Sequence, residues 1–361
     1  MTSTAPAWDP APFRDRVQQV LDAFLAEQET RLEPLGDDAA RLLAEARATV
    51  SGGKRFRAAF CYWGYQAIAG PPTGAGDDEA LVRACAALEI LHASALVHDD
   101  FMDASDTRRG RPATHRGFAD VHRAQGWRGD PDQYGASAAI LLGDLLLSWS
   151  DQLLRRCGLP LDRVVAALGV LDRCRSEVIA GQFLDVSVQA RGEADVDAAM
   201  TVLRYKSAKY SVERPLHIGA TLAGGTDRQL AELGAFGLPL GEAFQLRDDL
   251  LGVFGDPVVT GKPAGDDLIE GKRTVLVALT LDAAPSDAAA HLDAALGTDL
   301  DEARVAELRR IIDASGATQQ VESVIAELAA RATATLRSAD LDDRARAVLL
   351  ELATAVTDRL L

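Results

Sequence analysis

The chain has 361 residues, of which 48% are hydrophobic and 25% are charged, a composition typical of a globular protein with a large core. Its formal net charge of −16 argues against nucleic acid or an anionic membrane as the main partner, although a local cation can still attract an anionic substrate. The four cysteines lack the spacing of metal ligands, which favours reduced thiols. Without a charged-then-apolar leader or a run of eighteen apolar residues, we expect a cytoplasmic protein with no membrane span.

Residues 1–12 carry three prolines and predict a flexible N-terminal arm, and residues 13–361 predict one domain. Apolar residues recur at helical spacing along most of the chain, and no segment alternates with the period of a strand. Prolines 215 and 239 fall inside two expected helices and predict a kink or break in each. The expected helices cover residues 13–31, 37–50, 54–69, 79–103, 136–154, 161–189, 198–224, 229–251, 274–281, 286–296, 301–314, 316–337 and 341–360. The sequence therefore predicts an all-α bundle of a dozen or more helices in a single domain.

The helix expected over 79–103 ends in three acids, which we name the first acidic motif: Asp99, Asp100 and Asp103. Acids at i and i+4 lie on one face of a helix, so Asp99 and Asp103 can reach toward the same point. Like charges in that geometry repel unless a cation lies between them, and carboxylate oxygens with room for water suit Mg²⁺. This helix end is a candidate magnesium site.

A second acidic motif, Asp248 and Asp249, ends the helix expected over 229–251. The stretch after it, rich in Gly, Pro and Asp, predicts a long functional loop that carries Lys262, Asp267 and Lys272. Taken alone, an acid pair is more often a solvated helix end, but acids at a helix C-terminus are unfavourable against the helix dipole. In a helical bundle two such ends can face one another across a central cavity, as in bundle metal sites.

Basic residues accompany both acidic motifs. Lys54 and Arg57 stand three residues apart behind two glycines, which predicts a helix start that grips a phosphate or diphosphate; a solvated basic patch is the alternative. Arg108 and Arg109 follow the first acidic motif, and Lys206 is a further candidate. Two acid clusters with several cations suit a Mg²⁺-bridged diphosphate better than a free carboxylate substrate.

Five motifs in order carry a family resemblance: GGKRFR, HDDFMDASDTRRGRPATH, GQFLD, YKSAKY and GEAFQLRDDLLGVFGDPVVTGKPAGDDLIEGKRT. From about Gly52 to Thr274 the chain resembles the trans-isoprenyl diphosphate synthases of the polyprenyl synthetase family. The resemblance implies an isoprenoid-synthase bundle around a central apolar cavity and a homodimer. It also implies three Mg²⁺ ions, which assist the condensation of isopentenyl diphosphate with an allylic diphosphate of five to fifteen carbons, while water is excluded.

The resemblance assigns roles residue by residue. It implies that Asp99 and Asp103 bind two of the metals, supported by Asp100. It implies Asp248 as the main ligand of the third metal, with Asp249 and Asp267 orienting its waters. The implied allylic-diphosphate residues are Arg108, Gln182, Lys206, Ser207, Gln245 and Lys262. The implied isopentenyl-diphosphate residues are Lys54, Arg57, His92 and Arg109. Asp99, Asp103, Lys206 and Asp248 are the main catalytic candidates, Asp185 is expected to position Lys206, and Lys272 matches a lysine of a closing loop.

Three positions depart from the family pattern. Gly252 stands where the second acidic motif normally has a third Asp, and we expect activity to survive this change. Ser207 replaces the usual Thr and keeps the hydroxyl. Lys209 stands where an apolar residue or Arg is common, and the sequence offers no reason for it.

Product length should depend on the side chains one helical turn before the first acidic motif. Ser94 and Ala95 are both small there, where family members that stop at fifteen carbons usually carry an aromatic residue. This predicts a longer tunnel and geranylgeranyl diphosphate (C20) as product, with farnesyl diphosphate or a product of C25 or more as alternatives. Trp149 is the candidate for the tunnel floor, against the alternative of ordinary core packing.

Three other functions share parts of this pattern. A class I terpene cyclase has the same fold, but it holds its third metal with an Asn/Asp–Ser/Thr–Glu motif, and this chain contains no Asn. A single-substrate cyclase would also have no use for the pocket of Lys54 and Arg57. Head-to-head synthases of the squalene type fit less well, because they lack the GKxxR motif that carries these two residues. A non-catalytic synthase subunit usually loses an acidic motif, and both are present here.

Overall fold

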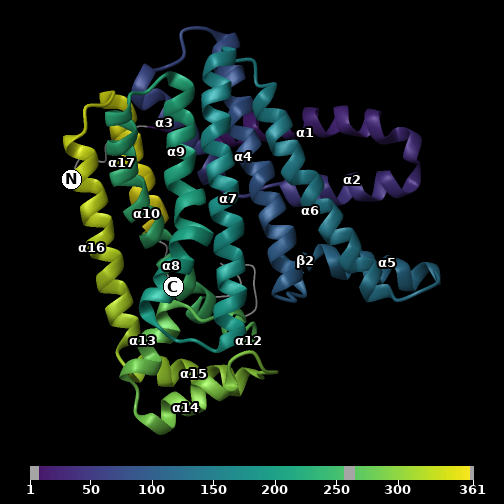
Figure 1. The fold of residues 1–361 in the computed structure, drawn as a ribbon, viewed down its shortest axis with the longest axis vertical. Helices are drawn as coiled ribbons and strands as arrows, with labels where there is room; N and C mark the ends of the chain where they lie inside the picture. The colour runs from purple at the N-terminus through teal and green to yellow at the C-terminus, as the bar shows by residue number, and fades with distance from the viewer. Residues whose placement is uncertain (1–7, 256–264, 358–361) are drawn as a thin grey trace. The chain divides into compact units, whose positions relative to one another are not determined.

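The computed structural model describes residues 8–255 and 265–357, and within them almost every element is a helix (Figure 1). The all-α prediction is confirmed. One strand pair was not predicted: β1 (Thr107–Arg108) runs antiparallel to β2 (Arg111–Pro112). Its two-residue turn has positive φ at both Arg109 (52°) and Gly110 (72°). Two-residue hairpins favour turns with positive φ at both positions, because the twist of such a turn matches that of the two strands.

The described residues divide into two compact units. Unit 1 contains residues 8–172, Pro215–Leu230 and Asp340–Glu351, and unit 2 contains most of the remainder, from Arg173–Arg214, Ala231–Ala339 and residues 352–357. The first acidic motif belongs to unit 1, and the second acidic motif with Lys206 belongs to unit 2. Among the described helices, four contribute residues to both units: α7 (Leu161–Arg191), α9 (Arg214–Ala223), α10 (Asp227–Phe254) and α17 (Asp343–Thr357).

Unit 1 is built around α4 (Ala75–Met102). This helix packs against α1 (Pro10–Leu32), α3 (Phe56–Ala69) and α6 (Pro131–Arg155). The helices α1 and α6 both begin at an Asp–Pro pair, where Asp9 or Asp130 accepts a backbone N–H of the first turn and the proline needs no partner for its nitrogen. The other elements of this unit are α1 (Pro10–Leu32), the 3₁₀ turn η1 (Glu33–Leu35), α2 (Asp37–Val50), α3 (Phe56–Ala69), α5 (Thr114–Gln125), α6 (Pro131–Arg155) and α9 (Arg214–Ala223).

Helix α4 is long and apolar enough, by length and composition, to cross a bilayer. Of its most apolar window, however, 78% is buried inside the protein, as is common for the core helix of a soluble protein. The four cysteines are buried and form no disulfide, as the sequence predicts.

Unit 2 has its own core, which buries Leu246 and Leu250 of α10 together with Leu276, Ile312 and Val321 from the helices that follow. These helices are α12 (Asp266–Ile269), α13 (Val275–Ala283), α14 (Ser286–Ala295), α15 (Glu302–Ala314) and α16 (Ala317–Ser338). Before α10 the unit contains α8 (Val196–Val202) and η2 (Leu203–Glu213), which is a π-helix.

Several predicted boundaries are wrong in detail. The helix expected from 198 to 224 is three segments, and its irregular part, η2, comes before Pro215 instead of at it. Helix α10 continues through Pro239 to Phe254, three residues beyond its expected end. Helix α1 begins at Pro10, inside the expected arm, because Asp9 caps it; the division into an arm and one domain stays a prediction.

Candidate active site

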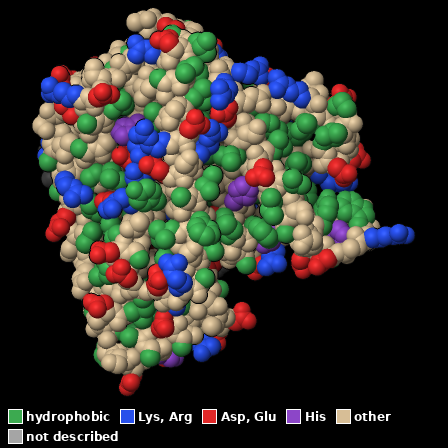
Figure 2. Space-filling view, in the orientation of Figure 1, with side chains coloured by type: hydrophobic (Ala, Val, Ile, Leu, Met, Phe, Trp, Pro, Cys, Tyr) green, Lys and Arg blue, Asp and Glu red, His purple; other side chains and the backbone are tan. Residues whose placement is uncertain are grey.

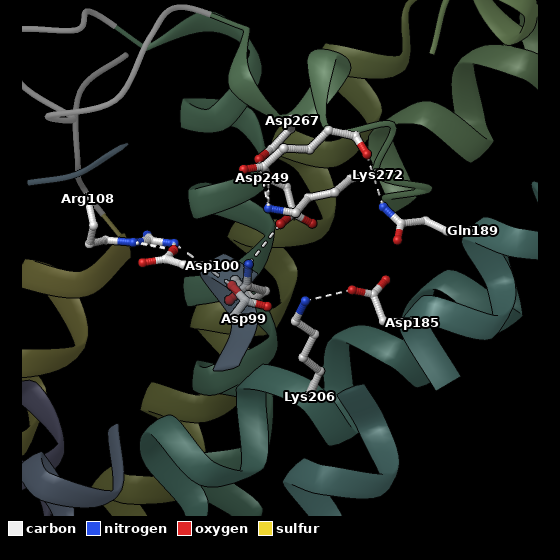
Figure 3. Close-up of polar contacts among 11 residues, drawn as sticks. Asp99, Asp100, Arg108, Asp185, Gln189, Lys206, Asp249, Asp267 and Lys272 are labelled. Carbon is white, nitrogen blue, oxygen red and sulfur yellow. Dashed lines mark hydrogen bonds and ion pairs between the residues drawn. The ribbon is translucent and has the colours of Figure 1, made fainter. Parts of the chain in front are cut away.

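The first acidic motif forms the last turn of α4, and Asp103 is its C-terminal cap, with its backbone N–H 2.8 Å from the Asp99 carbonyl oxygen. The β1–β2 hairpin turns the chain back so that Arg108 meets these acids (Figure 3). The Arg108 Nε donates to Asp100 Oδ1 at 2.8 Å, and its Nη2 lies 3.9 Å from Asp99 Oδ2. A cationic side chain therefore already offsets part of the like-charge repulsion that the sequence predicts at this helix end.

The structure differs from the prediction that Lys54 and Arg57 lie on one face at the start of α3. The helix begins at Phe56, because Arg55 adopts the left-handed conformation (φ 56°) and ends the loop before it. Lys54 is exposed in that loop, so it does not share a helix face with Arg57, and the predicted i, i+3 geometry is wrong.

Sequence reasoning missed the pair that holds this loop, Arg55 and Glu89. Both side chains are 5% exposed, and Arg55 Nη1 lies 3.2 Å from Glu89 Oε2. Arg55 Nη2 also donates to Gln18 Oε1 and to the Val50 carbonyl oxygen, each at 2.6 Å. Glu89 Oε1 accepts the backbone N–H of Ala58 at 3.1 Å, in the first turn of α3. The available signal was Glu89 itself, an acid inside an apolar stretch of helix, which needs a buried cation.

Three of the predicted isopentenyl-diphosphate residues lie close enough to affect one another. Burial holds the pKa of His92 well below its ordinary value, and the charges of Arg57 and then Arg109 add to that effect. Arg109 Nη1 donates to the Ser51 carbonyl oxygen at 2.7 Å, and a Cβ on Gly53 would stand 3.3 Å from Arg109 Nη2. The imidazole is therefore neutral at pH 7 and lies among cations that would attract an anion.

The predicted chain-length residues have ordinary packing partners in unit 1. The Ser94 hydroxyl is buried and donates to the Gly143 carbonyl oxygen of α6 at 2.7 Å. Trp149 is buried and packs edge-to-face on Phe24, with 6.0 Å between the ring centroids. Ala95 is half-buried. Their effect on product length stays a prediction.

Unit 2 contains the predicted pair of Asp185 and Lys206. Lys206 belongs to η2, and its Nζ donates to Asp185 Oδ2 of α7 at 2.6 Å (Figure 3). Gln182 precedes Asp185 on α7 and Ser207 follows Lys206, and both are half-buried.

The second acidic motif contains one exposed and one buried acid. Asp248 is exposed, whereas Asp249 is 8% exposed and accepts from Gln245 Nε2 at 2.8 Å. Burial, and next the neighbouring charge of Asp267, raise the pKa of Asp249 to about 8. Two buried carboxylates that repel one another in this way form a suitable place for a divalent cation.

Gly252, the departure from the family pattern, has a steric explanation. A Cβ at this position would overlap the carboxyl group of Asp267, which fills the space where a side chain at 252 would begin. The Asp267 carboxyl group therefore leaves no room for a side chain at position 252.

Lys272, just after α12, is tied to the same cluster. Lys272 Nζ lies 3.4 Å from Asp267 Oδ1 and also pairs with Glu270 (Figure 3). The Glu270 carbonyl oxygen accepts from Gln189 Nε2 of α7 at 3.3 Å. Lys262, the remaining predicted diphosphate ligand, lies outside the described residues.

The donor set fits Mg²⁺ better than a metal held by protein alone. Within residues 8–255 and 265–357, no group of three or more His, Cys, Asp or Glu side chains gathers as a ready metal site. Carboxylates at two helix ends are present instead, and Mg²⁺ in proteins is commonly held by one or two carboxylates together with water and substrate phosphates. Fold and site thus define a class: an all-α protein with carboxylates and cations suited to magnesium and a diphosphate.

Comparisons with known proteins agree with that class. The model of the polyprenyl synthetase family matches residues 40–314. A short chain isoprenyl diphosphate synthase of Methanothermobacter thermautotrophicus is 31% identical over 88% of this chain and 90% of its own length. A geranylgeranyl diphosphate synthase of Mycobacterium tuberculosis is 36% identical over 69% of this chain and 64% of its own.

A solved structure is similar over nearly the whole chain. It is a geranylgeranyl pyrophosphate synthase from Corynebacterium glutamicum in complex with isoprenyl diphosphate and magnesium. The two share 40% identity with a TM-score of 0.94, over 98% of this chain and 100% of that one. The chain belongs to the polyprenyl synthetase family, and it is accordingly a trans-prenyltransferase.

Proposed function

We propose that the protein condenses isopentenyl diphosphate head-to-tail with allylic diphosphates of five to fifteen carbons, releases diphosphate and yields all-trans geranylgeranyl diphosphate. The observation that carries this proposal is the buried pair of Asp249 and Asp267. Burial, and next the charge of Asp267, raise the pKa of Asp249 to about 8, so the pair favours a divalent cation, and this reaction requires one to hold the leaving diphosphate.

In this proposal the acids of each motif bind magnesium. Three Mg²⁺ ions would be held by Asp99, Asp100, Asp103, Asp248, Asp249 and Asp267. Bound there, magnesium would supply Lewis-acid neutralisation of the leaving diphosphate. The residues of the chain that bind the allylic diphosphate directly are Arg108, Gln182, Lys206, Ser207, Gln245 and Lys262. Asp185 orients Lys206 for this contact, and Lys272 holds the loop segment beside Asp267.

Lys54, Arg57, His92 and Arg109 bind isopentenyl diphosphate. The arginines supply charge-assisted hydrogen bonds to its phosphates, and the neutral imidazole of His92 adds one N–H donor without adding charge. Arg55 and Glu89 do not contact substrate in this proposal. They hold the loop that carries Lys54 at a fixed distance from the first turn of α3.

The direct test is incubation of the purified protein with Mg²⁺, isopentenyl diphosphate and each allylic primer in turn, followed by chromatography of the products. We expect diphosphate release and a C20 product, both abolished by EDTA. A C15 or C25 product would overturn the assignment of chain length. No prenyl product from any primer would overturn the function itself and leave the non-catalytic subunit.

A variant tests the chain-length residues. Ala95→Phe should shorten the main product toward C15, because an aromatic ring one turn before the first acidic motif would block the tunnel. A radiolabelled product assay measures this, and Ser94→Ala, which removes only the hydroxyl that binds the Gly143 carbonyl, is the matched control. An unchanged product spectrum in Ala95→Phe would remove Ala95 from the chain-length proposal.

The protein is proposed to work in the cytoplasm as a homodimer. In support, Ile140 and Leu141 of α6 are 44% and 62% exposed, and Figure 2 shows hydrophobic side chains at the surface along this helix. Light scattering after size-exclusion chromatography should give twice the mass of the chain, and Leu141→Glu should lower that mass.

A further inference from the structure

A segment of unit 2 has unusual backbone geometry. The π-helix η2 covers eleven residues, Leu203–Glu213, whereas π-helices are rare, mostly limited to one turn, and often found at functional sites. Lys206 lies within it. A π-turn contains more residues than an α-turn, so the direction in which Lys206 leaves the helix depends on this geometry being kept.

Glu177 of α7 holds the C-terminal end of η2. Lys209 Nζ lies 3.1 Å from Glu177 Oε1, and Arg214, the residue after η2, donates through Nε to Oε2 and through Nη2 to Oε1, both at 2.7 Å. Burial alone would raise the pKa of Glu177, but the hydrogen bonds from Arg214 and Lys209 outweigh it and bring the pKa below its ordinary value. The carboxylate is therefore charged and binds two cations at once.

The same face of α7 contacts η2 at Lys206. Glu177, Gly181 and Asp185 are spaced by four residues, so they lie along one face of the helix. A Cβ on Gly181 would overlap the backbone of Tyr205 and Lys206, which shows that the two helices touch there. Asp185 binds the Lys206 ammonium group at 2.6 Å (Figure 3). One face of α7 thus fixes η2 at Lys206 and Lys209, and fixes the residue that follows it, Arg214.

We propose that Glu177 is a positioning residue for prenyl transfer: through Lys209 and Arg214 it keeps η2 in π geometry and so sets where Lys206 meets the allylic diphosphate. This inference rests on the proposed role of Lys206. It also explains Lys209, for which the sequence offered no reason. Asp185 orients the end of the Lys206 side chain, whereas Glu177 fixes the backbone from which that side chain starts.

The test is the steady-state kinetics of Glu177→Gln, which removes the charge and keeps the shape. We expect the KM for the allylic diphosphate to rise roughly tenfold to a hundredfold, the scale of a displaced substrate contact, with little change in the KM for isopentenyl diphosphate. Lys209→Met should shift the same constant less, because Arg214 still binds Glu177. If Glu177→Gln does not fold, the KM of Lys209→Met for the allylic diphosphate tests the inference in its place.

A matched control separates positioning from general destabilisation. Asp78 of unit 1 is also an acid with two partners, Tyr62 and Arg16, each at 2.8 Å. Asp78→Asn should lower the Tm and leave both KM values unchanged. If it reproduces the selective rise in the KM for the allylic diphosphate, or if Glu177→Gln and Lys209→Met both leave that KM unchanged, the inference is overturned.

A double-mutant cycle shows whether Glu177 acts through Lys206. In a Lys206→Ala background, Glu177→Gln should cause no further loss of kcat/KM, because the positioned group is gone. A further loss of the same size as in the wild type would overturn the inference. If Lys206→Ala alone kept full activity, the proposed role of Lys206 would fail instead, so the two failures are distinguishable.

Discussion

Two clusters of charged residues, one in each unit, are crowded with charges of opposite sign. In unit 1, Arg57 and Arg109 add to burial in holding the pKa of His92 down, so cations crowd one another. In unit 2, Asp267 adds to burial in raising the pKa of Asp249 to about 8, so anions crowd one another. Crowded like charges are unfavourable without a ligand and favour a counter-charge. The difference indicates that this part of unit 1 is suited to an anion and this part of unit 2 to a cation.

The two acidic motifs differ in how strongly cations of the protein itself bind their acids. The acids of unit 1 have a strong internal partner, because Arg108 binds Asp100 at 2.8 Å. The buried acids of unit 2 have a weaker one, because Lys272 stays 3.4 Å from Asp267 and pairs also with Glu270. A metal at the first motif would compete with Arg108 and leave that guanidinium to the diphosphate. A metal at the second would relieve repulsion that Gln245 and Lys272 only partly offset.

The largest expected effect comes from Asp249→Asn, which tests the anionic crowding. The amide is isosteric with the protonated acid that predominates at pH 7 when the pKa is about 8, so the Tm without Mg²⁺ should stay unchanged. Activity should fall by up to about a hundredfold, because a carboxylate that orients the waters of the third metal is lost. Thermal unfolding and product formation measure the two effects.

The exposed neighbour Asp248 serves as the comparison. Asp248→Asn should also reduce activity, but the charge of Asp248 raises the pKa of Asp249 less than that of Asp267 does, so the change is not expected to alter the apparent Mg²⁺ affinity as strongly as Asp249→Asn does. Equal losses of Mg²⁺ affinity in both variants, measured by metal titration, would show that burial of Asp249 has no special part in metal binding.

A smaller effect is expected from Gly252→Asp, although it restores the family pattern. The new side chain would overlap Asp267 and add a further anion to a crowded cluster, so we expect a loss of about 1–3 kcal/mol of stability and roughly tenfold lower activity. Denaturant unfolding and kinetics measure both. Combining the change with Asp267→Ala should recover part of the loss. Full activity in Gly252→Asp alone would contradict the steric explanation.

The sequence was sufficient to predict the features that depend on local spacing. Helical periodicity gave most helices to within a few residues, and the acid spacing marked the ends of α4 and α10. The pair of Asp185 and Lys206 also followed from family motifs, and its hydrogen bond is present.

Features that depend on tertiary contacts could not be predicted in this way. Helix α3 begins at Phe56, two residues after its predicted start, because buried Arg55 takes a left-handed conformation to reach Glu89. This contact joins residues 34 positions apart. The absence of an acid at Gly252 makes sense only once Asp267 is seen to fill the space. The π geometry of η2 has no pattern of its own in the sequence, since it is held by Glu177 from another helix.

The smallest expected effect tests the cationic crowding in unit 1 through pH. Because the pKa of His92 is lowered in the folded state, the unfolded chain binds a proton below pH 6.5 that the folded protein does not, so stability is lost as the pH falls through that value. His92→Gln removes this loss. Between pH 7.5 and 5.5 the variant should therefore lose about 1 kcal/mol less free energy of unfolding than the wild type. In Arg109→Gln, which removes one neighbouring cation, the pKa of His92 rises and the pH-dependent loss should shrink. Urea unfolding at the two pH values measures all three proteins, and parallel losses in wild type and His92→Gln would contradict cationic crowding around this histidine.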